Sequence, residues 1–186
     1  MLQISEHCSA GCSHCPFKQN KIFYKLEELK EKANNLSSPL LTITGGEPLE
    51  HPHFFEIIQW LSSKDMAFRV ATGGHISMEQ KITNLIDMPG FMGINLGTDV
   101  LSSRNCNQEQ KVIWWQNLHL LQLKNIPWSL TLTLDDDLSL FPIVEEIQRK
   151  NFIPHFLMIN EISGFSSKQD FINKLLEGPW QNLKYI

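Results

Sequence analysis

Short apolar runs alternate with amphipathic segments along the whole chain. Most of the apolar runs are rich in β-branched or aromatic residues and are typical of buried strands: residues 2–5, 40–44, 67–72, 91–96, 128–134 and 155–160. The other segments carry apolar residues at helical spacing: residues 23–33, 53–63, 77–88, 107–124, 139–150 and 166–178. This alternation predicts six β–α units.

Capping residues mark the starts of two of these helices. Ser77 is followed three positions later by Gln80, which is a capping-box pattern, and Asn107 is an N-cap candidate at the start of the long helix. We therefore expect helices to begin next to these two positions.

Strands that alternate with helices predict an α/β fold with a parallel sheet and right-handed crossovers. Two architectures fit six such units: an open doubly wound sheet, or a partial (β/α) barrel shorter than the eight-unit barrel. In both, functional residues are expected at the carboxyl ends of the strands.

Composition narrows the class of protein. The chain has 186 residues, of which 42% are hydrophobic, so we expect one domain with a substantial core. The net charge is −4 and acidic and basic residues are mixed, so nucleic acid is not an expected partner. No apolar run approaches the length that a bilayer requires, and "MLQISEHC" lacks the architecture of a signal peptide. We expect a soluble, cytoplasmic protein with no membrane partner.

The segment "CSAGCSHC" places Cys8, Cys12 and Cys15 close together, and the fourth cysteine is Cys106. Thiolates are soft ligands for zinc, copper(I) or iron–sulfur clusters. A zinc site would need His14 as fourth ligand, which is awkward because His14 directly precedes Cys15. A four-iron cluster with three thiolates would keep one iron open, unless Cys106 closed it. The spacing alone leaves these alternatives open.

Two motifs resemble those of the radical S-adenosylmethionine (radical SAM) superfamily. "CSAGCSHC" resembles its CxxxCxΦC signature, and "TITGGEPLEHP" (42–52) resembles its GGEP motif at the end of the second strand. The resemblance implies a partial (β/α)6 TIM-like barrel, with residues 1–186 as a single core domain. That domain would include the cluster loop 8–15, the motif 45–48, and a short C-terminal helix and tail over 166–186. No cysteine follows Cys106, so we expect a minimal form without a SPASM or twitch extension.

The resemblance also implies a cofactor chemistry. Cys8, Cys12 and Cys15 would hold three irons of a [4Fe–4S] cluster, and the amino and carboxylate groups of S-adenosylmethionine would bind the fourth. Reductive cleavage of S-adenosylmethionine would then give a 5′-deoxyadenosyl radical that takes a hydrogen atom from the substrate.

Several residues match cofactor-binding positions of that family. Gly45 and Gly46 would allow close approach of the methionine moiety, Glu47 would accept hydrogen bonds from its amino group, and Pro48 would fix the turn. The resemblance also assigns to this set His14 near the adenine, Thr72 in "VATGG", Asn95 in "INLGTD" and Arg104 for the cofactor carboxylate.

Positions near later strand ends are further candidates. Asn160 and Glu161 could face the pocket at the end of the sixth strand. Cys106 could donate a hydrogen atom to a substrate radical, or could simply be a packed thiol.

The substrate expected from the resemblance is a peptide or protein side chain, modified for example by epimerisation or cross-linking. The alternatives are a small-metabolite or nucleotide enzyme, similar to the deazaguanine-forming branch, and an activase for a glycyl-radical enzyme. The expected electron donor is of the flavodoxin or ferredoxin type. The C-terminal tail and residues 113–115 could pack across a homodimer, or could belong to an ordinary core.

Overall fold

One parallel sheet organises the computed structural model, which describes residues 1–186 except 14, 16, 18–19, 37, 135–139, 162–167, 177 and 186. The strands are β1 (Leu2–Gln3), β2 (Leu40–Thr44), β3 (Ala67–Thr72), β4 (Phe91–Gly97), β5 (Trp128–Leu134) and β6 (Leu157–Glu161). The main helices are α1 (Leu26–Asn34), α2 (Phe54–Ser62), α3 (Glu79–Leu85), α5 (Gln108–Leu123), α6 (Leu140–Arg149) and α7 (Lys168–Leu175). Short helical segments are η1 (Pro48–Glu50), α4 (Asp99–Ser102) and η2 (Gly178–Trp180).

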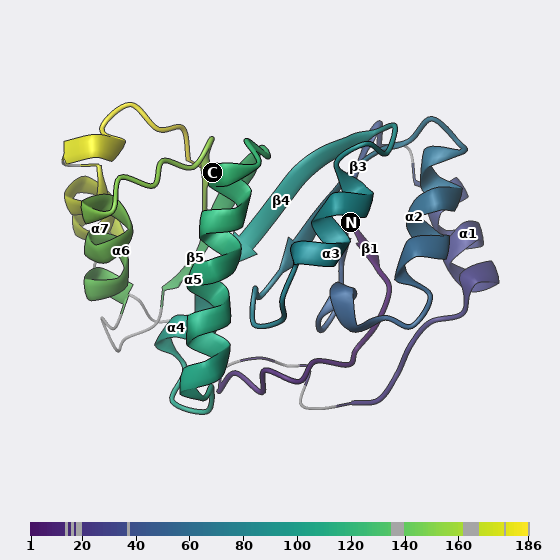
Figure 1. The fold of residues 1–186 in the computed structure, drawn as a ribbon, viewed down its shortest axis with the longest axis horizontal. Helices are drawn as coiled ribbons and strands as arrows, with labels where there is room; N and C mark the ends of the chain where they lie inside the picture. Colours follow the sequence, from purple (N-terminus) through teal and green to yellow (C-terminus); the bar gives the residue numbers. More distant parts are fainter. Residues whose placement is uncertain are drawn as a thin grey trace.

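The strand order settles the choice between the two predicted architectures. The six strands lie in the order β1-β2-β3-β4-β5-β6 and all neighbouring pairs are parallel. A doubly wound sheet reverses direction at a switch point, whereas this sheet advances one strand with every crossover. Figure 1 shows the helices following one another across the sheet from α1 and α2 to α6 and α7. The predicted partial (β/α)6 barrel is confirmed, with β1 and β6 as the first and last strands of the sheet.

Most predicted elements agree with the structure to within a few residues. The first strand is shorter than the predicted 2–5, because Ser5 already pairs antiparallel with Phe23. Ile4 remains tied to the second strand, since its amide donates to Thr44 O at 2.8 Å. The chain is therefore bent out of the sheet immediately before the first cysteine.

The helix caps were predicted with mixed success. Asn107 caps α5 in a capping box with Gln110, as expected. The predicted box at Ser77 is wrong, because α3 begins one residue later with Met78 at the N-cap and no side-chain cap. Instead, the backbone amide of Met78 at the start of α3 donates a hydrogen bond to Oδ1 of Asn117 on α5 at 3.0 Å.

The core lies between the sheet and the helices. On β3, Phe68 and Val70 are fully buried, whereas Arg69 and Ala71 on the other face are only half-buried. This is the period-two alternation of a strand whose two faces differ. On α5, Trp114 is fully buried and donates its indole N–H to Gly97 O at 2.7 Å. Trp114 is therefore part of the core, in agreement with the core interpretation of residues 113–115.

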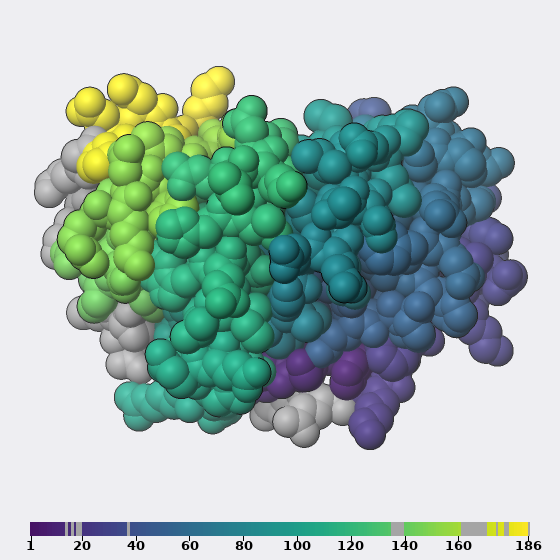
Figure 2. Space-filling view, in the orientation of Figure 1, coloured from purple at the N-terminus to yellow at the C-terminus, as the bar shows by residue number. Residues whose placement is uncertain are grey.

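Helices cover most of the face seen in Figure 2, where the purple N-terminal residues emerge at the lower edge beside residues of the α4–α5 region. Figure 1 shows that the same purple loop runs along the end of the sheet where α4 and the start of α5 lie. No helix in the described part of the chain combines the length and the apolar character needed to cross a membrane.

Candidate metal and cofactor site

The cysteine loop leaves β1 and lies across the carboxyl end of the sheet. Cys8 and Cys106 are buried, Cys12 and Cys15 are half-buried, and all four are free thiols. Cys15 N donates to Cys12 O at 3.2 Å, which closes a turn between the second and third cysteines. The predicted position of the three clustered thiols beyond the end of the first strand is therefore observed.

The glycines of the GGEP segment hold this loop against the sheet. Gly46 N donates to Ser5 O at 3.0 Å, and Glu47 N donates to His7 O at 2.7 Å. A Cβ atom on Gly46 would lie 2.3 Å from His7 O, and one on Gly45 would lie 2.6 Å from Ser5 O. Both positions need glycine because the backbone of the cysteine loop approaches so closely.

A cavity of about 510 Å³ opens beside this loop. Its walls are formed by residues two positions apart on neighbouring strands, because alternate side chains of a strand point to the same face. These are Thr42 and Thr44 of β2, Arg69 and Ala71 of β3, Asn95 and Gly97 of β4, and Met158 and Asn160 of β6. Its mouth carries Cys8, Cys12, Cys15, Gly45 and Gly46, together with Asp99 of α4. A volume of this size is typical of small-molecule and cofactor sites.

Asn95 is held firmly in the wall of this cavity. Its Oδ1 accepts from Ser129 Oγ at 3.1 Å and from Thr131 Oγ1 at 2.7 Å, and its Nδ2 lies 3.2 Å from the sulfur of Met158. These contacts join β4, β5 and β6 across the cavity wall, so the Asn95 amide is fixed before any ligand binds.

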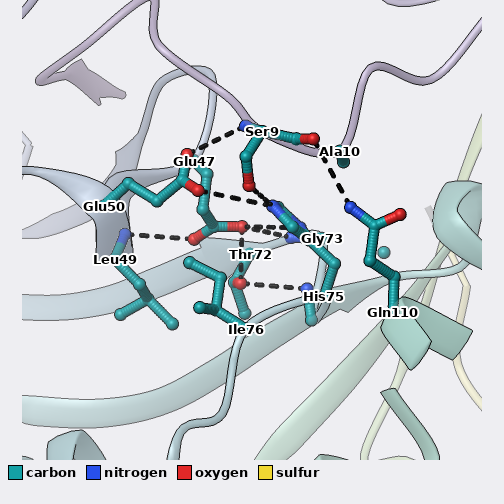
Figure 3. A network of polar contacts seen from close by, with 12 residues as sticks. Ser9, Ala10, Glu47, Leu49, Glu50, Thr72, Gly73, His75, Ile76 and Gln110 are labelled. Atoms are coloured by element: carbon teal, nitrogen blue, oxygen red, sulfur yellow. Dashed lines mark hydrogen bonds and ion pairs between the residues drawn. The ribbon is translucent and has the colours of Figure 1, made fainter. Parts of the chain in front are cut away.

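Glu47 is held by a buried network of hydrogen bonds. Its side chain is fully buried and lies outside the cavity lining. One carboxylate oxygen accepts from Thr72 Oγ1 at 2.8 Å and Gly73 N at 3.0 Å, and the other accepts from Leu49 N at 3.0 Å (Figure 3). Through these contacts Glu47 joins the ends of β2 and β3, and its predicted contact with the amino group of the cofactor stays a prediction.

A buried histidine lies beside the same carboxylate. His75 Nδ1 is 3.7 Å from Glu47 Oε2, and its Nε2 is 3.8 Å from Glu50 Oε1 and 3.1 Å from Ser9 Oγ (Figure 3). Burial lowers the pKa of His75, but hydrogen bonds with Cys8 and Glu50 and the charge of Glu47 outweigh it and raise the pKa to about 10. The raised pKa favours the protonated form of His75, which lies beside Cys8.

Cys8 lies between this network and the cavity. It lines the cavity mouth, and the ligand atoms of Cys8, Glu50 and His75 all lie within 4.8 Å of one another. Glu50 also accepts from Ser9 N at 3.0 Å, which ties the loop residue after Cys8 to η1. The sequence analysis missed His75 and Glu50, although a histidine directly after the end of a strand was a visible signal.

Cys106 lies behind Cys12 and outside the cavity lining. The two sulfur atoms are 3.8 Å apart, and the Cys106 thiol donates to Ala10 O at 3.4 Å. Burial raises the pKa of Cys12, and the neighbouring Cys106 raises it further. Burial likewise raises the pKa of Cys15. Without a bound cation Cys12 and Cys15 thus favour their protonated forms, and binding a metal there would release protons.

The remaining predicted residues fall into three groups. Thr72 lines the cavity, but its hydroxyl donates a hydrogen bond to Glu47. Pro48 is buried at the start of η1 and does not line the cavity. Arg104 is exposed on the loop after α4 and is not among the lining residues. His14, and the side chain of Glu161, lie outside the described residues.

Polar residues inside the strands were also missed. Thr42, Arg69 and Thr131 line the cavity from otherwise apolar strands, and Met158 faces it from the sixth. Period-two alternation of polar and apolar positions within β3 could have revealed Arg69. The donor set at the mouth fits an iron–sulfur cluster, because three soft thiols face one cavity whose rim is glycine backbone.

Comparison with known proteins agrees with this geometry. Residues 2–136 match the model of the radical SAM superfamily. A GTP 3′,8-cyclase of Haemophilus ducreyi is 32% identical over an alignment of 114 residues, and the match covers 55% of this chain and 33% of that protein. The chain thus spans about a third of this curated relative.

Solved structures show the same fold at low identity. SuiB of Streptococcus suis bound to S-adenosylmethionine superposes with a TM-score of 0.65 and 10% identity, over 98% of this chain and 45% of that one. The structure of anSMEcpe with bound AdoMet and a peptide superposes with a TM-score of 0.64 and 15% identity, over 93% of this chain and 55% of that one. Both therefore extend well beyond the part that this chain matches.

The family match covers well over half of the chain. Assignment of the residues after 136 to the same domain remains a prediction. Members of this family use a [4Fe–4S] cluster and S-adenosylmethionine and need a reductant and a substrate. The chain is an enzyme of the radical SAM superfamily.

Proposed function

We propose that the enzyme abstracts a hydrogen atom from a peptide or protein side chain held in the 510 Å³ cavity, with a cluster bound at its mouth. The observation that carries this proposal is the convergence of Cys8, Cys12 and Cys15 on that mouth, next to the backbone of Gly45 and Gly46. When bound, the [4Fe–4S] cluster supplies the electron that cleaves S-adenosylmethionine to the 5′-deoxyadenosyl radical.

The chain's own residues would bind and orient the reactants. The three thiolates would hold three irons, and backbone groups of the GGEP segment would face the methionine end of the cofactor. The fixed amide of Asn95 would meet the nucleoside part, since Asn95 is held by β5 and β6 in the cavity wall. Glu47 would act as a positioning residue by keeping the ends of β2 and β3 together.

A peptide substrate is supported by the open side of the sheet. Among the described residues no strand pairing joins β1 to β6, so this part of the chain lacks the two further strands that close an eight-stranded barrel. An extended chain could enter through such a gap. The solved structures at low identity support the fold alone and do not favour this substrate over another.

A small metabolite is the second candidate. The curated relative at 32% identity is a GTP 3′,8-cyclase, which acts on a nucleotide. The electron donor for either reaction is proposed to be a flavodoxin or ferredoxin.

Deuterium transfer distinguishes the two candidates. The anaerobically reconstituted, reduced enzyme is incubated with S-adenosylmethionine and either a pool of perdeuterated peptides or a pool of deuterated nucleotides. Deuterium in 5′-deoxyadenosine identifies the class that loses a hydrogen atom, and the proposal expects it from the peptides. Cys12→Ala is the matched control and should release no 5′-deoxyadenosine. Transfer from nucleotides alone would favour the second candidate, and no 5′-deoxyadenosine with either pool would refute the proposal.

A further inference from the structure

Arg69 projects into the cavity from the middle of β3. Its neighbours Phe68 and Val70 are fully buried in the core on the opposite face of the strand, so Arg69 and Ala71 face the cavity. Arg69 precedes the last residue of the strand, Thr72, by three positions, which corresponds to about 10 Å along a strand. It therefore lies well below the mouth where the cysteines gather.

Two contacts fix the direction of the Arg69 side chain. Its Nε donates to Thr42 Oγ1 at 2.9 Å, directly across the β2–β3 pair in which Thr42 and Arg69 are register partners. Its guanidinium carbon lies 5.5 Å from the ring centroid of Phe156, which precedes β6 on the opposite side of the cavity. The guanidinium thus reaches across the cavity from one wall toward the other.

Apart from the Phe156 ring, the rest of the guanidinium has no hydrogen-bond or ion-pair partner in the described part of the chain. No carboxylate among those residues lies within ion-pair distance of Arg69, and only Nε has a hydrogen-bond partner there. Besides Arg69, the lining includes the neutral side chains of Thr42, Thr44, Asn160 and Met158, and also the N-terminal residue Met1. The carboxylate of Asp99 follows the end of β4 and lies at the mouth.

The terminal nitrogens of Arg69 have no hydrogen-bond partner among the described residues, so they are available to an anionic ligand in the cavity. Arginine presents a planar fork of N–H donors that matches a carboxylate or a phosphate with two parallel hydrogen bonds. Because Nε is already committed to Thr42, the two terminal nitrogens would form the fork that faces the cavity.

We propose that Arg69 binds an oxyanion group of the substrate, a carboxylate or a phosphate, at the base of the cavity. This inference rests on the proposed use of the cavity for substrate, and it names the chemistry that anchors the substrate there. The anion would be held near the base while the part of the substrate that reacts extends toward the cysteines at the mouth. A carboxylate would come from a peptide and a phosphate from a nucleotide-like metabolite.

Direct binding of small anions tests the proposal without any turnover. The reconstituted enzyme with S-adenosylmethionine is titrated with glutarate and, separately, with methylphosphonate at constant ionic strength, and binding is followed by saturation-transfer NMR. Arg69→Gln should weaken binding of the preferred probe at least about tenfold, because a charge-assisted pair is lost. Arg149→Gln, on the exposed surface of α6, is the matched control and should bind as the wild type does.

Chemical modification gives a second readout that needs no variant. The chain has only three arginines, Arg69, Arg104 and Arg149. Phenylglyoxal labels arginine, and peptide mass spectrometry reports each site. The bound probe should protect Arg69 and leave the labelling of the other two unchanged.

The outcomes separate this inference from the proposed function. Preference for glutarate would identify a carboxylate substrate, and preference for methylphosphonate a phosphate, and either result supports the role of Arg69. Equal binding by Arg69→Gln and the wild type, absence of binding to both probes, or equal labelling with and without probe would overturn it. An enzyme that releases 5′-deoxyadenosine but binds neither probe would lose only the Arg69 assignment.

Discussion

Replacing Gly46 with alanine should detach the cysteine loop from the sheet. The added Cβ would lie 2.3 Å from the carbonyl oxygen and 2.6 Å from the carbonyl carbon of His7, which are backbone atoms that no rotamer change can move. To relieve this contact the loop must retreat, and the bonds Gly46 N to Ser5 O and Glu47 N to His7 O must lengthen or break.

The expected cost follows from these two effects. Overpacking of a tight site costs about 1–3 kcal/mol, and each lost backbone hydrogen bond about 0.5–1.5 kcal/mol. Gly46→Ala should therefore lower the free energy of unfolding by about 2–6 kcal/mol. Iron binding should fall as well, because the loop that carries Cys8 is displaced.

Urea unfolding of the cluster-free protein by circular dichroism, and iron content after anaerobic reconstitution, measure these effects. Gly97→Ala is the control, since a Cβ there meets Thr72 O at 3.6 Å, an ordinary contact, and its cost should be about 1 kcal/mol or less. If Gly46→Ala unfolds within about 1 kcal/mol of the wild type and binds as much iron, the packing argument is refuted.

Three further predictions concern the buried groups around the site. Thr72→Val removes a donor to the fully buried Glu47 and should cost about 1–3 kcal/mol in urea unfolding, and a neutral result would contradict the positioning role. In the cluster-free protein, His75 stabilises the fold below its ordinary pKa of 6.5 and loses this effect as the pH rises toward 10, because its pKa is raised in the folded state. The difference in unfolding free energy between wild type and His75→Gln should therefore shrink from pH 6 to pH 10, and an unchanged or growing difference would be evidence against the buried imidazolium. Cys106→Ala should bind as much iron as the wild type whereas Cys12→Ala should not, and loss of iron from Cys106→Ala would make Cys106 a ligand.

The fold was largely predictable because local pattern and tertiary structure agree in most elements. β2, β3 and β5 have the predicted bounds, and the cap at Asn107 formed as its own side chain dictates. The start of α3 was not predictable, because Asn117, distant in sequence, bonds Met78 N and also donates to Gly74 O and Ile76 O. A hydrogen bond from α3 to α5 thus takes the place of the local cap that Ser77 and Gln80 had predicted.

The candidate site was predictable only where the motif itself carries the chemistry. The three clustered cysteines indicate a soft-metal site from the residues alone, because thiolates are soft ligands. The resemblance to the radical SAM motifs was needed to predict a cluster there and a cofactor beside the two glycines. The direction in which a side chain points could not be predicted from the sequence. Glu47 turns into the protein and Cys106 lies behind Cys12, because neighbouring donors and packing decide orientation. Arg69 was missed since its role depends on the opposite wall of the cavity.

Electron paramagnetic resonance of the reduced, reconstituted enzyme tests most directly whether three thiolates hold the cluster and keep one iron open. The account predicts a [4Fe–4S]⁺ signal that changes on addition of S-adenosylmethionine, and a hyperfine coupling from ¹⁵N in its amino group. Cys106→Ala should give the same signal and the same coupling. Bound zinc instead of iron, or a cluster signal that S-adenosylmethionine leaves unchanged, would contradict it.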